Sequence, residues 1–217
     1  MGYKHLNQKI AIYVQKPIAD QECAKALFDV CANKYQTFFL DHKTLNKKNL
    51  SDVNCIAFPG GLGDADNFDF LLKDKKNLIK KYVQNGGKYL GICMGAYLAG
   101  RHYFDLLDGI DTFQYSKREH SEINKEKDII KILWKRRYYD MYFYDGCSIA
   151  GDKRKLKIYS YYQNGDPMAG IQKNIGLIGC HPESPLKWYE DINSKQKWNN
   201  GKNHKLLLDF INDLINK

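Results

Sequence analysis

Short apolar runs alternate with stretches of helical periodicity through the first half of the chain, and this alternation constrains the fold more than any other feature. Four runs have the length and composition of buried strands, at residues 9–14, 35–40, 55–58 and 88–92. Three stretches have helical spacing, at residues 19–34, 71–83 and 93–99. Strands that alternate with helices call for a parallel sheet with right-handed crossovers and helices on both faces. The sequence therefore predicts a doubly wound α/β arrangement.

The second half of the chain carries strand-like runs that no helix separates. They lie at residues 128–134, 138–144, 155–162 and 168–172. This pattern predicts an antiparallel β extension of the sheet. The apolar run at residues 175–180 predicts a last strand, and residues 202–215 have the spacing of a closing amphipathic helix.

The composition limits the class of protein. With 217 residues, of which 43% are hydrophobic, the chain favours one domain over residues 1–217. It contains no apolar run of the roughly 18 residues that a membrane span needs, and it starts without the apolar stretch of a secretory signal. We therefore expect a cytoplasmic protein with no membrane partner. Six scattered cysteines without CxxC spacing favour neither disulfides nor a metal site, and no cofactor is expected.

The formal net charge of +9 is compatible with nucleic-acid binding. The lysines, however, are spread along the whole sequence, which favours a solvated surface. The densest basic stretch, at residues 135–137, precedes a pair of tyrosines, and we interpret it as a turn that enters a strand. Nucleic acid is therefore not expected as a partner, and only tight, steeply salt-dependent binding would revive that alternative.

The strongest local signal is the segment GICMG at residues 91–95, between a predicted strand and a predicted helix. It has the G-x-nucleophile-x-G form of a nucleophile elbow, in which a sharp turn exposes the central side chain and the glycines leave room for it. The start of a helix also favours the thiolate form of a cysteine. A cysteine taken alone is more often an inert buried side chain. In this context we predict that Cys93 is a nucleophile.

A thiolate nucleophile needs a base, and the base needs an acceptor that orients it. His181 fits best, because it directly follows the apolar strand at residues 175–180. Glu183 lies two positions further, across Pro182, where an extended X-Pro geometry can bring its carboxylate back to the imidazole. Cys93, His181 and Glu183 are therefore the predicted catalytic residues.

Two glycines supply backbone N–H groups at the predicted carboxyl edge of the sheet. Gly60 and Gly61 follow the strand at residues 55–58, where open α/β folds place their ligands. We predict that these two residues and the N–H group of Met94 form an oxyanion hole.

Three motifs, PGG at residues 59–61, GICMG at residues 91–95 and HPE at residues 181–183, resemble the class I glutamine amidotransferase superfamily in order and separation. The longer strings AFPGGLGDADNF, IKKYVQNGGKYLGICMGAY and IGLIGCHPES are similar to the amidotransferase-like domain at the N-terminus of eukaryotic-type biotin-protein ligases. The resemblance implies a flavodoxin-like sheet and a Cys-His-Glu triad. If glutamine is the substrate, it also implies a γ-glutamyl thioester intermediate.

One position departs from this resemblance. Many glutamine-hydrolysing members of the superfamily carry a Gln two residues after the second elbow glycine, where it contacts the substrate, and this chain has Tyr97 there. We therefore assign Tyr97 to the substrate-binding side of the site. The chain also carries no attached synthetase, so any amidotransfer would require a separate synthetase or ligase as partner.

Two hypotheses of function follow. The first is a cysteine-dependent amide hydrolase or acyl transferase that acts on glutamine or a related γ-glutamyl or peptide amide. The alternative is a catalytically silent amidotransferase-like domain that binds or regulates a partner enzyme, and Tyr97 and the missing synthetase favour it.

Overall fold

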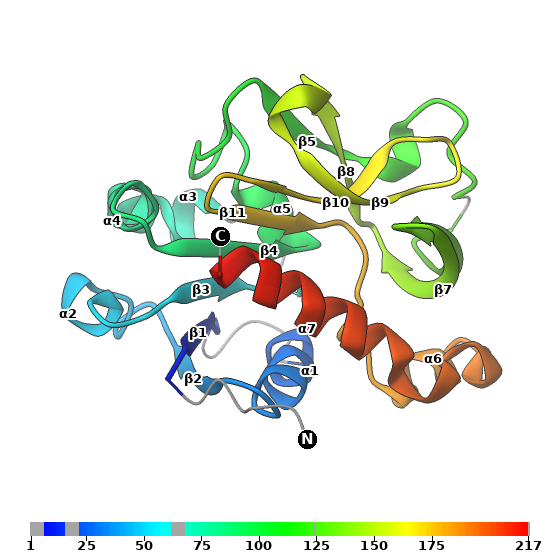
Figure 1. Cartoon of the computed structure of the whole chain (residues 1–217), viewed down its shortest axis with the longest axis horizontal. Helices are drawn as coiled ribbons and strands as arrows, with labels where there is room; N and C mark the ends of the chain where they lie inside the picture. The colour runs from blue at the N-terminus through cyan, green and yellow to red at the C-terminus, as the bar shows by residue number, and fades with distance from the viewer. Residues whose placement is uncertain (1–6, 16–21, 62–67, 124, 217) are drawn as a thin grey trace.

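The computed structural model describes residues 7–15, 22–61, 68–123 and 125–216 of the chain. Nine strands form one sheet, in the order β2 (Gln36–Leu40), β1 (Lys9–Tyr13), β3 (Cys55–Phe58), β4 (Lys88–Ile92), β11 (Ile175–Ile178), β10 (Pro167–Gln172), β9 (Lys157–Tyr161), β6 (Lys127–Trp134) and β7 (Arg137–Tyr144). The strands from β2 to β11 run parallel, and the remaining four are antiparallel (Figure 1). The predicted α/β fold with an antiparallel extension is therefore confirmed.

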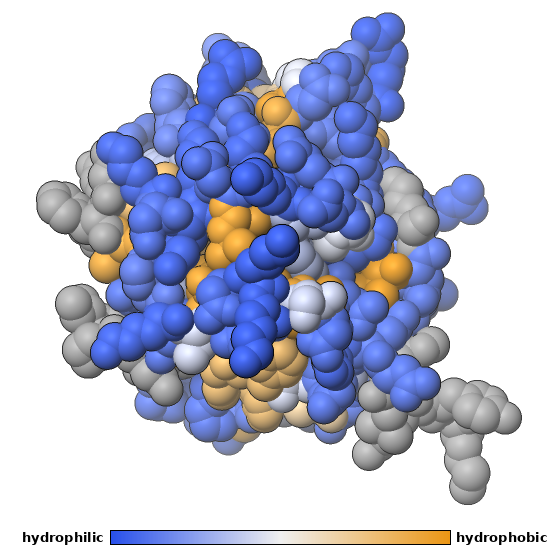
Figure 2. Space-filling model, turned by 90° about the vertical axis from the view of Figure 1, so that its left-hand side faces the viewer, coloured by the Kyte–Doolittle hydropathy of each residue, from blue (hydrophilic) through white to orange (hydrophobic). Residues whose placement is uncertain are grey.

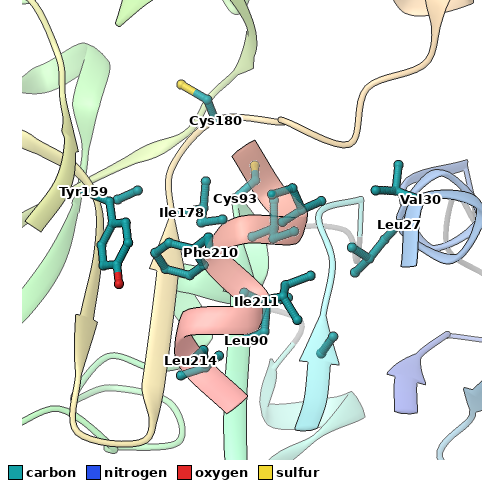
Figure 3. Close-up of a cluster of buried hydrophobic side chains, with 14 of the residues drawn as sticks. Leu27, Val30, Leu90, Cys93, Tyr159, Ile178, Cys180, Phe210, Ile211 and Leu214 are labelled. Carbon is teal, nitrogen blue, oxygen red and sulfur yellow. The ribbon is translucent and has the colours of Figure 1, made fainter. Parts of the chain in front are cut away.

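Helices cover both faces of the parallel strands, with α1 (Glu22–Cys31) and α7 (Lys202–Ile215) on one face and α2 (Lys47–Leu50), α4 (Lys76–Gln84) and α5 (Met94–Leu98) on the other. Successive side chains of a strand point to opposite faces, so Ile12 packs in the first layer and Tyr13 in the second. Figure 3 shows the first layer, in which Leu27 of α1 and Phe210 of α7 belong to the same apolar cluster as Cys93. Within the described ranges, every helix is too short or too polar to cross a bilayer.

Two predicted helices differ from the structure. The helix predicted over residues 71–83 is broken into α3 (Phe68–Leu71), a single 3₁₀ turn and α4. Leu72 leaves the helical conformation, with φ −136°, while its side chain stays buried. The apolar spacing therefore continues across the break, which is why it predicted one helix. Of the helix predicted over residues 19–34, residues 19–21 lie outside the described residues, and α1 ends at Cys31.

A second, two-stranded sheet was not predicted. It pairs β5 (Ile110–Gln114) with β8 (Cys147–Gly151). Both strands are only five residues long, and too few apolar positions alternate in them to produce a periodic signal. The turn that precedes β8, at Asp145 and Gly146, agrees with the interpretation of that dipeptide as a turn.

The antiparallel extension curls back toward the parallel strands. Its last strand, β7, lies at the far edge of the large sheet, yet Tyr142 of β7 forms a β-bridge with His181, just beyond the end of β11. The N–H group of His181 donates to the carbonyl oxygen of Tyr142 at 3.0 Å. The curl therefore brings the end of β7 over the carboxyl edge of the parallel strands, where β3, β4 and β11 end.

Candidate active site

The turn between β4 and α5 has the geometry of a nucleophile elbow. Cys93 lies there with φ 51° and ψ −110°, a conformation that costs free energy in any residue with a side chain. Both flanking glycines are required by close packing. A Cβ on Gly91 would lie 2.3 Å from the carbonyl oxygen of Gly95, and a Cβ on Gly95 would lie 1.8 Å from that of Phe58. The sequence pattern GICMG therefore reflects contacts that leave no room for a methyl group.

The helix that follows the elbow is short. α5 ends at Leu98 and contains only five residues, so its macrodipole is small. The first backbone N–H groups of any helix nevertheless lack partners within the helix, and the N–H group of Met94 belongs to them. A negative charge at this elbow would therefore be stabilised by nearby backbone N–H groups and not by the dipole of a long helix.

His181 and Glu183 form a buried pair. Nδ1 of His181 lies 2.8 Å from Oε1 of Glu183, and each side chain is about 1% exposed. An ionised carboxylate can only accept hydrogen bonds, so Nδ1 carries the proton of this contact. Ser184 fixes the turn, because its hydroxyl and its backbone N–H group both donate to the carbonyl oxygen of His181. Nε2 of His181 is buried and faces away from the contact with Glu183, and the side chain of Cys93 interacts with the imidazole and raises its pKa.

Gly60 lies against both Cys93 and His181. A Cβ at Gly60 would lie 2.7 Å from Cε1 of His181 and 3.4 Å from Cβ of Cys93. Cys93 and His181 follow the neighbouring parallel strands β4 and β11, whose carboxyl ends meet at one edge of the sheet. Gly61, with φ 68°, turns the chain away at this point. The structure thus brings together Cys93, His181, Glu183 and the predicted oxyanion residues Gly60, Gly61 and Met94.

Aromatic rings and a second thiol surround the imidazole, and no pattern in the sequence indicates them. The ring of His181 makes edge-on contacts with Tyr142, at a centroid distance of 6.0 Å, and with Trp188, at 5.5 Å. Cys23 of α1 packs in the same cluster as these two rings, and its Sγ also lies 3.4 Å from the position of a Cβ on Gly60. These apolar contacts hold the ring of His181 in place and keep water away from it.

The turn between β7 and β8 covers the elbow. The thiol of Cys93 donates to the carbonyl oxygen of Tyr144 at 3.2 Å, and the hydroxyl of Tyr97 donates to that of Asp145 at 3.2 Å. Burial is the main cause that raises the pKa of Tyr97, so this hydroxyl stays protonated. A thiolate has no proton to donate, so this contact with Tyr144 belongs to the thiol form of Cys93. Tyr144 and Asp145 were predicted only as strand and turn residues, without a place in the site.

Nearby charges set the protonation state of His181. Burial lowers its pKa, but the negative charge that Cys93 carries as a thiolate and that of Glu183 raise it by more, to about 10. The imidazolium is therefore the stable form when Cys93 is ionised. Because the pKa is raised above the ordinary value of 6.5, protonation of His181 stabilises the fold fully below about pH 6.5, and this contribution is lost as the pH rises through about 10.

We expect the substitution Glu183→Gln to lower the pKa of His181 below about 10, because it removes one of the two charges that raise it. A titration of the imidazole carbons by NMR measures this directly. The difference in the free energy of unfolding between wild type and variant should be largest below about pH 6.5 and should shrink as the pH rises toward 10. A pKa of His181 that is unchanged in the variant would contradict the assignment of Glu183 as its partner.

No group of three His, Cys, Asp or Glu side chains within the described ranges has the geometry of a metal site. All six cysteines are reduced and buried.

Comparisons with known proteins bear on the family and on the fold. The sequence model of the family described as "Biotin-protein ligase, N terminal" matches residues 13–108, a segment that contains Gly60, Gly61, Cys93, Met94 and Tyr97 and ends before His181. A search of curated proteins with the sequence found no significant match.

Solved structures match nearly the whole chain. A glutamine amidotransferase from Thermotoga maritima superposes with a TM-score of 0.67 at 13% identity, covering 98% of this chain and 100% of its own. The structure of PurLQS from Thermotoga maritima gives a TM-score of 0.65 at 14% identity, with coverage of 95% and 100%. A glutamine amidotransferase from Methylobacillus flagellatus gives 0.57 at 14% identity, with coverage of 87% and 75%. At these identities the likeness establishes the fold. The chain therefore has the flavodoxin-like fold of the class I glutamine amidotransferases, and residues 13–108 match the N-terminal family of biotin-protein ligases.

Proposed function

We propose that the protein is a cysteine-dependent amide hydrolase or acyl transferase of the glutamine amidotransferase type. The observation that supports this most is the contact of Gly60 with both Cys93 and His181, together with the 2.8 Å pair of His181 and Glu183. A nucleophile, a base and an acceptor that orients the base are the three parts that thiol-dependent acyl transfer requires. In this chain the three groups follow the adjacent strands β4 and β11, and all three side chains are buried.

The proposed reaction begins with proton transfer from Cys93 to Nε2 of His181. The thiolate attacks the carbonyl carbon of the amide, and the N–H groups of Gly60, Gly61 and Met94 stabilise the oxyanion that forms. The C–N bond breaks as His181 returns its proton to the leaving nitrogen, which leaves a thioester on Cys93. His181 then accepts a proton from a water molecule as its oxygen attacks the thioester carbonyl carbon. The C–S bond breaks, His181 returns the proton to the sulfur of Cys93, and the carboxylic acid leaves.

Glutamine, or a related γ-glutamyl or peptide amide, is the proposed substrate. The glutamine amidotransferases among the structural neighbours support this choice. Transfer of the released ammonia to an acceptor would require a separate synthetase or ligase as partner. The match of residues 13–108 to a biotin-protein ligase family supports a ligase as the first candidate for this partner. We further propose that the protein is cytoplasmic and that residues 1–217 form one domain.

The direct test is covalent labelling of the pure protein with a γ-chloroketone analogue of glutamine. We expect one adduct per chain by intact mass, located at Cys93 by peptide mapping, and slower labelling in the presence of free glutamine. An adduct spread over several cysteines, or a rate that glutamine does not change, would contradict a glutamine-type site. Because this test needs no nitrogen acceptor, a missing partner does not affect its outcome.

A catalytically silent domain that docks on a partner enzyme is the second candidate. The thiol of Cys93 donates to Tyr144, and Tyr97 stands where many glutamine-hydrolysing relatives have Gln, so the elbow is covered on the substrate side. This candidate predicts no labelling of the folded protein at Cys93. Labelling that appears only in the variant Tyr97→Gln would support it, because that result would show intact chemistry behind a closed pocket.

A further inference from the structure

A cleft lies at the opposite end of the sheet from Cys93 and His181. Its volume is about 400 Å³, and it is bounded by α2 on one side and α4 on the other. Val53, which precedes β3, and Gly87, which precedes β4, form part of its lining. The cleft therefore lies at the amino edge of the parallel strands, away from the elbow, on the side of the molecule that carries α2 and α4 (Figure 1).

The floor of the cleft is apolar and fixed in place. Leu50 and Val53 are buried, and Leu78 and the ring of Tyr82 are half-buried beside them. The hydroxyl of Tyr82 donates to the carbonyl oxygen of Val53 at 3.0 Å. A Cβ on Gly87 would lie only 2.4 Å from the ring of Tyr82, so the ring lies directly on the backbone of Gly87. The cleft is therefore formed before any ligand arrives, which lowers the entropic cost of binding.

The backbone acceptors at this end of α4 are already used. The carbonyl oxygens of Lys81, Tyr82 and Val83 accept hydrogen bonds from the N–H groups of the next turn of chain, at 3.0 to 3.1 Å. The carbonyl oxygen of Val53 is taken by Tyr82. The end of the helix therefore offers few free acceptors that would oppose the binding of an anion.

Two lysines line the cleft from different helices. Lys47 lies on α2 and Lys81 on α4, and both are exposed. In the part of the chain that the structure describes, neither forms an ion pair with a carboxylate. The neighbouring acids Asp52 and Asp105 are instead paired with Lys9 and Lys80. Figure 2 shows this side of the molecule, where apolar patches are surrounded by hydrophilic side chains. The mouth is thus positively charged without a counter-charge of its own.

We propose that this cleft binds a small organic anion with an apolar body, such as an aryl or alkyl carboxylate. The apolar body packs on Leu78 and Tyr82, and the carboxylate lies between Lys47 and Lys81. The volume is within the range of ligand pockets, roughly 300 to 1,000 Å³. Apolar contact supplies the affinity, and the two lysines select for negative charge. The cleft contains no residue of the elbow, so a negative result for this proposal would leave the proposed function untouched, and the reverse also holds.

The test is a titration of the ¹⁵N-labelled full chain with phenylbutyrate and, separately, with its neutral amide. We expect saturable shifts of the backbone amides of Leu50, Val53 and Gly87 with the carboxylate, and binding at least about tenfold weaker with the amide. The double substitution Lys47→Glu and Lys81→Glu should weaken phenylbutyrate binding by about tenfold or more. The control Lys48→Glu reverses one charge on α2 next to Lys47 but outside the lining, which is half the charge change of the double variant, and should change the affinity by less than about threefold.

The proposal would be overturned by the absence of saturable shifts at about 10 mM phenylbutyrate, by equal affinity for the amide, or by unchanged binding in the double variant. Thermal unfolding of each variant checks that the exposed substitutions leave the fold intact. Shifts that map to the elbow instead of the cleft would also count against it, since they would assign the ligand to the other end of the sheet.

Discussion

The substitution Cys93→Ala is expected to abolish covalent labelling by the γ-chloroketone analogue of glutamine, because it removes the thiol placed at the elbow. Cys23→Ala is the matched control. Its thiol is as buried as that of Cys93, at 7% exposed, and also borders Gly60, but it lies on α1 and not at a strand-to-helix turn. We expect the control to be labelled at the wild-type rate, as measured by intact mass over time.

Two outcomes would count against the assignment of the nucleophile. Equal labelling of Cys93→Ala and wild type would show that another thiol reacts. Loss of labelling in Cys23→Ala, with Cys93 intact and the fold preserved by circular dichroism, would transfer the role to the thiol of α1.

The substitution His181→Gln is expected to slow labelling at neutral pH by about 10²- to 10⁴-fold, the usual contribution of a general base. The variant keeps Cys93 but loses the imidazole that accepts its proton. Its labelling rate should therefore rise with pH as the thiol ionises without help, whereas the wild-type rate should already be high at neutral pH. A pH series of labelling rates measures this difference.

His204→Gln is the control for this variant. Nε2 of His204 contacts the carbonyl oxygen of Ser184 at 3.1 Å, so it touches the same segment of chain without entering the site. Its labelling rate should match that of wild type. A rate in His181→Gln within about threefold of wild type across the pH series would remove the imidazole from the mechanism.

Local patterns in the sequence explain why the structure brings the candidate site residues together. Cys93 lies between a buried strand run and a helix start, flanked by glycines at fixed spacing, and close packing around Gly91 and Gly95 requires that spacing. His181 and Glu183 are separated by a single proline, so the geometry of one short segment brings the carboxylate to the imidazole. That Cys93 and His181 meet follows from the rule that parallel strands end at one edge of a sheet.

The cover over the elbow could not be predicted, because it depends on contacts between distant parts of the chain. The alternation along β7 shows which side chains share a face, but not that the extension curls until Tyr142 bridges His181. The contacts of Tyr144 with Cys93 and of Asp145 with Tyr97 use backbone carbonyl groups, which every residue has. No residue type marks such a contact in a sequence.

The bridge between Tyr142 and His181 has a consequence for how the chain can be divided. The segment that matches the biotin-protein ligase family, residues 13–108, holds the sulfur, whereas the imidazole, its carboxylate and the cover over the elbow all come from later residues. A fragment that stops near residue 108 would lack all of these groups, and it would also lack β11 beside β4 and the helix α7 that covers one face of the sheet. The second half of the chain therefore completes both the architecture around the elbow and the proposed chemistry.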